Sequence, residues 1–462
     1  MKPRLSLLKN ARNVRIENLV VEGKVTNMTQ PTGDPLDKLY GRVSHSAILN
    51  SSGRADDVRC YPGTREEVIR KIEDWKNRQD CTSRMMWLSG PAGAGKTAIV
   101  QTVAEGWKKH GIPAASFFFF RADRTRNTAQ PIVATLLYQL FKFLPALKES
   151  AATLLSENPL MFQESLNEQF THFIYTPIHA LMQQPSSDVQ IPIVLLVDGL
   201  DECGDEGTQE RLLHALQDLV APEDSPFMVL VASRQEPNLI MAFKKLPQAV
   251  AAIYLDDEYR PAEDIRRFVA AKFDEIKRTH HLSHNLRADW PLDSDIENIT
   301  TKSSGQFIYA ATVMRFLEHS AESPHIMLKI VQGIQPAENH TPFAQLDTMY
   351  SHIFSQAKNP VAIRNIFAMH FISALDSANH PLCGFLESKY NSTTVESIIS
   401  TLSSIVRLER SGFTKLVFYH ASLGDFLLDK SRSGMHFLNM HAAWVELTLD
   451  LLVSGNSYST WH

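Results

Sequence analysis

The chain has 462 residues, of which 44% are apolar and 21% are charged, and this balance excludes an intrinsically disordered chain, a collagen-like fibre and a disulfide scaffold. Lys and Arg together number 46 and Asp and Glu 51, so the formal net charge of −5 provides no basic surface for nucleic acid or an anionic membrane. The four cysteines are scattered, and no apolar run approaches the roughly 20 residues that span a bilayer. We therefore expect a cytoplasmic protein of about three domains, with no nucleic-acid partner and no membrane span.

Residues 1–57 differ in pattern from the rest of the chain. Apolar and polar residues alternate loosely from Val14 to Val25, which predicts one or two short strands, and a stretch rich in Pro, Gly, Asp and Ser follows. We assign this segment as a leader that ends in a linker. A helix is then predicted over residues 64–75, opened by the capping-box pattern Thr64-Arg65-Glu66-Glu67.

Short apolar segments alternate with helical patterns from residue 58 to residue 255. The predicted strands are residues 85–89, 115–120, 191–197 and 227–232. Strands that alternate with helices form a parallel sheet with helices on both faces. The sequence therefore predicts an α/β domain over residues 58–255.

The strand pattern fades after residue 255. Helical spacing of apolar residues predicts a helical domain over residues 256–345. Residues 405–409 and 415–419 then flank a turn and predict a hairpin, and Ser422 is expected to cap a helix that starts at Leu423. Helices followed by a hairpin suggest a winged-helix domain over residues 346–440, with a helical tail over residues 441–462.

The most informative segment is a glycine-rich loop between a predicted strand and a predicted helix. It fits the pattern G-x-x-x-x-G-K-T, and its residues are Gly90, Pro91, Ala92, Gly93, Ala94, Gly95, Lys96 and Thr97. Glycines let successive backbone N–H groups face a β-phosphate, while the lysine reaches the β- and γ-phosphates and the threonine hydroxyl ligates Mg²⁺. The following helix would point its positive end at the anion. The loop predicts binding of ATP or ADP with Mg²⁺.

Two further strand ends carry polar residues. The strand over residues 191–197 ends at Asp198, which would hold Mg²⁺, and Asp201 or Glu202 would act as the base that orients the attacking water. The pattern does not decide between these two acids. Arg234 follows the strand over residues 227–232 and is placed to sense a γ-phosphate through a charge-assisted hydrogen bond.

This series of motifs resembles the NACHT family of signal-transducing P-loop NTPases, which contains animal innate-immune nucleotide-binding receptors, and in particular the fungal NACHT proteins of basidiomycetes and the nephrocystin-like N-terminal domains. The acidic signature carries the likeness best, because Gly199 follows Asp198 directly and the next acids come two residues later. The resemblance extends over roughly residues 58–440. Arg121 and Arg126 also match the fungal version. They could reach a phosphate or a neighbouring subunit, although exposed structural arginines are the account we favour.

The resemblance continues into the C-terminal half. The segment around His420 is similar to the winged-helix segment of NACHT receptors, in which a histidine contacts the β-phosphate of bound ADP and locks the closed state. The resemblance therefore implies that His420 is the lock, whereas residue type alone would favour a core histidine. Phe307 stands where related proteins have a proline that touches the base, so the resemblance does not define the adenine contact.

The resemblance implies a nucleotide-controlled signalling switch. ADP would hold the chain closed and monomeric, ATP would favour an open state that self-associates through the NTPase domain, and slow ATP hydrolysis would reset it. Such a switch would serve fungal non-self recognition or programmed cell death through an unknown signalling or sensor partner. Two alternatives remain: a scaffold that holds nucleotide permanently, and a P-loop kinase. NACHT receptors usually carry C-terminal sensor repeats, which we expect to be absent from residues 441–462.

Overall fold

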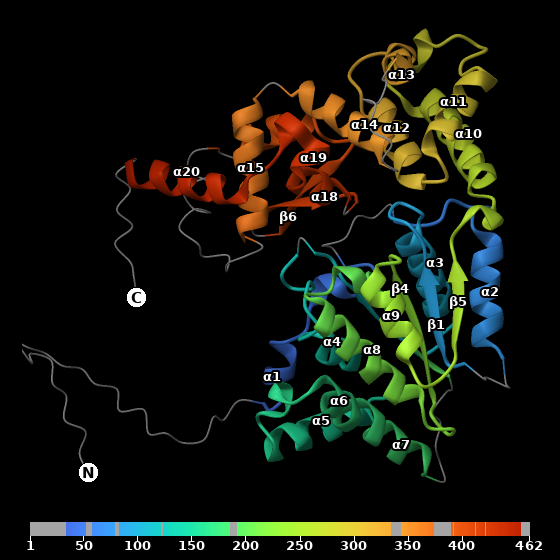
Figure 1. Cartoon of the computed structure of the whole chain (residues 1–462), viewed down its shortest axis with the longest axis vertical. Coiled ribbons are helices and arrows are strands. Elements are labelled where there is room, and N and C mark those ends of the chain that lie inside the picture. The colour runs from blue at the N-terminus through green and yellow to red at the C-terminus, as the bar shows by residue number, and fades with distance from the viewer. Residues whose placement is uncertain are drawn as a thin grey trace, which may run out of the picture.

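The computed structural model of the chain describes residues 34–51, 58–78, 83–121, 123–184, 192–333, 343–357, 359–373, 390, 392–411, 413–420 and 422–453. The predicted strands between Val14 and Val25 lie outside these residues. In Figure 1 the N-terminal half forms a sheet with its helices, and the helices of the C-terminal half lie beyond the ends of the strands.

The sheet of the N-terminal half has five parallel strands. They are β1 (Met85–Ser89), β2 (Ala114–Phe118), β3 (Ile193–Asp198), β4 (Phe227–Ser233) and β5 (Val250–Tyr254), in the spatial order β2-β3-β4-β1-β5. The four predicted strands are confirmed to within two residues. β5 was not predicted, because this edge strand is half-exposed and contains two alanines, which are poor strand formers.

Helices cover both faces of this sheet. The helices α2 (Glu66–Lys76) and α3 (Lys96–Lys109) pack on one face, where their apolar side chains form a single cluster with those of the strands. The other face is covered by α4 (Ile132–Leu140), α8 (Glu206–Val220) and α9 (Pro237–Lys245), and α5 (Ala146–Glu157), α6 (Leu166–Phe170) and α7 (Thr176–Met182) extend the same apolar cluster. The predicted parallel sheet flanked by helices is confirmed.

The N-terminus of α2 differs from the predicted capping box. The Thr64 hydroxyl donates to the carbonyl of Tyr61 (2.7 Å) and does not cap the helix. Arg65 occupies the cap position in the left-handed region (φ 57°), and its N–H donates to the carboxylate of Asp264 at 2.9 Å. The capping-box prediction is therefore wrong, because a residue distant in sequence takes over the free backbone donor.

Part of the predicted linker packs against the sheet. Residues 34–51 contain α1 (Asp37–Tyr40) and a turn of 3₁₀ helix (His45–Ala47). Leu36, Leu39 and Ala47 are buried in the same apolar cluster as the side chains of β2. This segment therefore belongs structurally to the α/β half of the chain.

The C-terminal half is mostly helical. Its helices are α10 (Pro261–Thr279), α11 (Asp293–Ser303), α12 (Phe307–Glu318), α13 (Pro324–Gly333), α14 (Ala344–Ser355), α15 (Pro360–Ser373), α17 (Ser392–Ser400), α18 (Ser422–Leu428), α19 (Lys430–Ser433) and α20 (Met440–Val453). The hairpin β6 (Val406–Ser411) and β7 (Phe413–Phe418) is antiparallel, as predicted. Ser422 is the first residue of α18, one position earlier than the predicted start.

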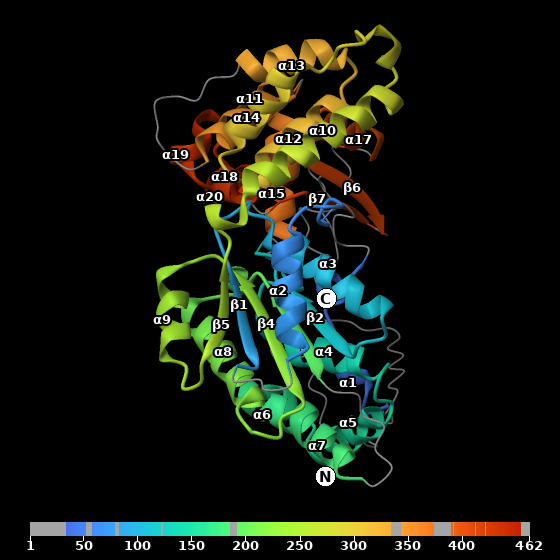
Figure 2. The same cartoon turned by 90° about the vertical axis from the view of Figure 1, so that its right-hand side faces the viewer.

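One apolar cluster runs through the whole C-terminal half, from Ile265 on α10 to Leu447 on α20. The helical segment and the segment that contains the hairpin therefore share a core. Figure 2 shows this half stacked over the carboxyl ends of the strands, from a direction perpendicular to that of Figure 1. Among the described residues, no helix combines the length and the apolar character needed to cross a bilayer.

Candidate nucleotide-binding site

The glycine-rich loop lies between β1 and α3, at the carboxyl edge of the sheet. Gly93 (φ 78°) and Gly95 (φ 90°) adopt backbone conformations that favour glycine. A Cβ atom at Gly93 would also overlap the side chain of Ile308 on α12. The Lys96 ammonium donates to the carbonyls of Gly90 (2.7 Å) and Pro91 (2.9 Å), and burial lowers the pKa of Lys96 to about 8.

The end of β3 brings three acids to the same edge. Asp198 is the last residue of the strand and is 4% exposed. Gly199 follows with φ 74°, and a Cβ atom there would lie 3.2 Å from the carbonyl oxygen of Phe119. The chain then turns through a 3₁₀ helix, Leu200–Glu202, which carries Asp201 and Glu202. The glycine between the acids is thus needed for the turn that separates Asp198 from the other two.

Arg234, directly after β4, joins the two halves of the chain. Its N–H donates to Oδ1 of Asp201 (2.9 Å), and its Nε lies 3.2 Å from Oδ2 of the same carboxylate. Its Nη2 donates to Oδ2 of Asp425 on α18 at 2.9 Å. The guanidinium therefore bridges a carboxylate of the α/β half and one of the C-terminal half, and we call this arrangement the arginine bridge.

Glu202 has different surroundings from Asp201. Its Oε2 accepts from the N–H of Arg121 (2.9 Å), and the Arg121 guanidinium donates to the carbonyl of Asp201 at 3.0 Å. Burial and the neighbouring charge of Asp201 raise the pKa of Glu202 to about 7. Arg121 also lies 3.9 Å from Asp425, so it contacts the site and is not an isolated surface residue. Arg126, by contrast, is buried against Asp123 at 3.1 Å.

His420 reaches the site from the segment after the hairpin. The N–H of Ser422 donates to its Nδ1 at 3.0 Å, and the Ser422 hydroxyl lies 2.8 Å from the same nitrogen and 2.9 Å from the hydroxyl of Tyr350. Burial and the positive charge of Arg234 lower the pKa of His420 to about 3. A neutral ring whose Nδ1 accepts a hydrogen bond carries its proton on Nε2, which is then a donor.

These residues surround one cavity of about 650 Å³ between the two halves of the chain, a size typical of small-molecule sites. Its wall contains the predicted site residues Ala92, Gly93, Gly95, Lys96, Thr97, Asp198, Asp201, Glu202, Arg234 and His420. Gly90, Pro91 and Ala94 do not line it. They support the wall through their carbonyls, which accept hydrogen bonds from Lys96 and Arg65.

Arg65 also lines the nucleotide cavity, although the sequence did not predict it as a site residue. It is 4% exposed, its Nη2 donates to the carbonyl of Ala94 (2.9 Å), and its guanidinium lies 5.0 Å from the ring centre of Phe307. Its Nε and Nη1 have no hydrogen-bond partner among the described residues. Phe307 lines the same cavity, so both residues are placed to contact a bound molecule. The only sequence signal was an arginine in a pattern that resembled a helix cap.

The donor set fits Mg²⁺. Thr97 and Asp198 both line the cavity and offer a hydroxyl and a carboxylate oxygen, the ligands that this hard cation prefers. Mg²⁺ usually takes only one or two protein ligands and completes its shell with phosphate oxygens and water. Thr97 and Asp198 would hold such an ion beside the loop.

The loop between β1 and α3, at the carboxyl edge of a parallel sheet, defines a P-loop nucleotide-binding domain. Residues 63–234 match the family model described as nephrocystin 3, N-terminal. The chain is also 24% identical over 377 residues to the vegetative incompatibility protein HET-E-1 of Podospora anserina. These two matches support the resemblance to NACHT-type P-loop proteins that the motifs suggested. The match covers 78% of this chain, which spans about a quarter (25%) of the length of that relative.

Two solved structures also match. A structure of AMPPCP-bound DnaA from Aquifex aeolicus is 16% identical, with a TM-score of 0.24, and the match covers 77% of this chain and 98% of that chain. A DNA replication initiation factor is 13% identical, with a TM-score of 0.23 and coverage of 73% and 92%. Both TM-scores are too low to bear on the function of this chain.

Proposed function

We propose that the chain is a nucleotide-controlled signalling switch. ADP and Mg²⁺, held by the P-loop and the C-terminal half, favour a closed chain, and ATP favours an open one. The helices α14, α15 and α17 with the β6–β7 hairpin serve as the winged-helix module that closes over the nucleotide. The arginine bridge is the observation that carries this proposal.

The bridge makes closure sensitive to the nucleotide. Arg234 directly follows β4, at the edge of the sheet where the γ-phosphate of ATP would lie. Its guanidinium would donate a charge-assisted hydrogen bond to that phosphate. Its Nη2 is bound to Asp425 of α18. A γ-phosphate that recruits Arg234 competes with Asp425, so ATP weakens a contact that ADP leaves intact. A ligand shifts an equilibrium only through such a difference between two states.

His420 adds a second contact that favours the closed chain. Ser422 and Tyr350 orient the ring, and the proton on Nε2 gives a neutral donor at the cavity wall. This donor suits the β-phosphate of ADP, which the resemblance to NACHT receptors assigns to it. Because the pKa of His420 is about 3, the donor stays neutral over the physiological pH range.

Slow ATP hydrolysis would reset the switch, with Glu202 as the base. Asp201 is engaged by Arg234 through two of its atoms, whereas Glu202 has a pKa of about 7, close to the value that suits general base catalysis. These environments favour Glu202 over Asp201.

In the open state the chain would self-associate head to tail through the NTPase domain. The relative from Podospora anserina is named for vegetative incompatibility. A role of that general kind, in non-self recognition or programmed cell death, is what we propose for this chain, together with a sensor or signalling partner that remains to be identified.

The arginine bridge is tested by Asp425→Asn. One charge-assisted hydrogen bond contributes roughly 1.5–3 kcal/mol, so we expect release of a fluorescent ADP analogue to be at least about tenfold faster. Light scattering should detect ATP-dependent self-association at lower protein concentration. Asp218→Asn is the matched control, because Asp218 is exposed on α8, away from the cavity. ADP release equal to that of the wild type would refute the proposal, as would tight nucleotide binding with no turnover.

A further inference from the structure

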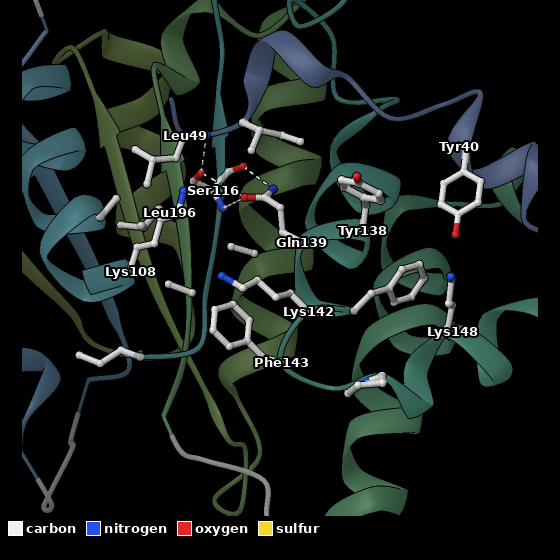
Figure 3. A pocket seen from close by; sticks show the side chains of 17 residues that line it. Tyr40, Leu49, Lys108, Ser116, Tyr138, Gln139, Lys142, Phe143, Lys148 and Leu196 are labelled. Carbon is white, nitrogen blue, oxygen red and sulfur yellow. Dashed lines mark hydrogen bonds between the residues drawn. The ribbon is translucent and has the colours of Figure 1, made fainter. Parts of the chain in front are cut away.

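A second cavity, of about 560 Å³, opens at the free edge of the sheet, beside β2. Its walls come from the packed N-terminal segment, the end of α3, β2, the end of α4 and the start of α5 (Figure 3). It shares no wall residue with the nucleotide cavity. Its size lies within the range of small-molecule sites.

The edge of β2 is closed to another strand at this point. The side-chain amide of Gln139 accepts from the N–H of Ser116 (3.1 Å) and donates to its carbonyl (2.9 Å), as a neighbouring strand would. Gln139 also donates to the carbonyl of Thr135 at 2.9 Å, which fixes the amide on α4. Because a side chain already satisfies this part of the edge, the cavity does not suit an extended peptide. A small molecule fits it better.

The wall is mostly apolar. Aliphatic and aromatic side chains come from four separate segments of the chain, and they include Ile48, Leu49, Ile112, Phe141, Phe143 and Leu196. Tyr40 and Tyr138 meet edge to face, with ring centres 6.1 Å apart, and add two phenol groups to the wall. The interior therefore suits an alkyl or aryl body.

All the charges on this wall are positive. Lys108 lies in the last turn of α3, Lys142 follows α4 and Lys148 lies on α5, and no Asp or Glu lines the cavity among the described residues. None of these three lysines forms an ion pair within the described part of the chain. Figure 3 shows the Lys142 side chain reaching toward β2 below Gln139. Figure 3 draws Lys148 well apart from Lys142, near Tyr40, so one negative head group would pair with Lys142, while the other two lysines keep the surroundings positive.

We propose that this cavity binds an amphiphilic anion, a molecule with a compact alkyl or aryl body and a single carboxylate or phosphate head. The apolar body would occupy the space beside β2, and the head would pair with Lys142. The site is independent of the proposed switch, because it stands on residues that do not touch the nucleotide cavity.

Decanoate is a suitable probe, with decanol as its uncharged counterpart. Calorimetry on the full chain, with saturating ADP and Mg²⁺, should show one decanoate bound per chain and binding of decanol at least fivefold weaker. Lys142→Gln should weaken decanoate by about threefold to fivefold and leave decanol unchanged, as expected for one exposed charge pair. Ala114→Phe, which fills the cavity from β2, should weaken both ligands at least tenfold.

Lys109→Gln is the matched control, because Lys109 neighbours Lys108 on α3 but does not line the cavity. It should bind decanoate like the wild type. The proposal is overturned by the absence of decanoate binding, by equal affinity for decanol, or by binding that ADP abolishes. It is also overturned if Lys142→Gln, an exposed substitution that should fold normally, binds decanoate with unchanged affinity.

Discussion

The two cavities lie at opposite ends of one helix and differ in what encloses them. The first turn of α3 carries Lys96 and Thr97 into the nucleotide cavity, and its last turns carry Ala104 and Lys108 into the edge cavity. A helix of this length separates its ends by roughly 20 Å. The nucleotide cavity is walled by both halves of the chain and holds charges of both signs, whereas the edge cavity is walled by residues 40–196 alone.

This difference separates two kinds of binding. A ligand between the two halves responds to their relative position, and its affinity is coupled to closure. A ligand in the edge cavity contacts only the α/β half, so a substitution that loosens the C-terminal half should leave its affinity unchanged. Variants that affect one cavity and spare the other test whether the two are as separate as their walls suggest.

The largest expected effect is that of Lys96→Ala on nucleotide binding. Loss of two charge-assisted hydrogen bonds to phosphate corresponds to an affinity for ADP and ATP that is at least about 100-fold weaker. Titration with fluorescent nucleotides measures the loss. Lys109→Ala, at the other end of α3, is the control, and decanoate binding should be unchanged in both variants. Normal binding of ATP and Mg²⁺ by Lys96→Ala would remove the basis of the proposed switch.

The next effect is that of Glu202→Gln on hydrolysis. Removal of a general base typically costs 10²- to 10⁴-fold in rate, and we expect roughly 10²-fold or more here, with ADP affinity retained. Because a base acts when deprotonated, the wild-type rate should rise with pH through about 7, the pKa of Glu202. Single-turnover hydrolysis between about pH 5.5 and 8.5 measures this limb. A Glu202→Gln protein that keeps the same rate and pH profile would leave Asp201 as the candidate base.

The raised pKa of Glu202 also makes the free energy of unfolding depend on pH. The folded chain holds a proton on Glu202 between the ordinary pKa of 4.5 and the folded value of about 7, so stability falls as the pH rises through this window. Thermal unfolding at pH 8 should therefore show Glu202→Gln to be more stable than the wild type, a difference that disappears near pH 4.

The smallest expected effect is that of Gln139→Leu. The substitution leaves the N–H and the carbonyl of Ser116 without the amide that pairs with them, at a cost of about 1–2 kcal/mol in the free energy of unfolding. Urea denaturation measures this cost, and Gln183→Leu, an exposed glutamine at the end of α7, is the control. A loss of nucleotide affinity in Gln139→Leu would show that the two cavities are coupled.

The sequence predicted the elements whose positions follow from a local pattern alone. Four strands are continuous apolar runs, and the P-loop motif fixed the start of α3, so their positions were readable from the sequence. β5 was not predicted although residues 249–255 are a continuous apolar run, because three of these residues are alanines, which are poor strand formers. The packed segment around Leu39 was read as part of a linker, since its burial depends on the distant side chains of α4 and β2.

Contacts between the two halves could not be predicted from local patterns. The motifs named Arg234 and His420, and the structure brings them to one cavity, but their roles remain proposals. Asp425, the partner of Arg234, lies 191 residues away from it, and no motif identifies Asp425 as a site residue. Arg65 was missed for a similar reason, because its conformation is fixed by Asp264, which lies 199 residues away. Such pairs depend on tertiary packing, which a single sequence does not display.

The side chain of Ile308 on α12 lies against the P-loop at Gly93. The hydrogen side chain of Gly93 allows Ile308 to rest directly against the loop backbone, where any Cβ would overlap that side chain. The loop therefore has a helical neighbour in contact with its main chain, with no side chain between them to absorb a displacement. Any change in loop geometry on phosphate binding would press on α12 directly. In this chain the phosphate loop is therefore also a packing surface that contacts the C-terminal half directly.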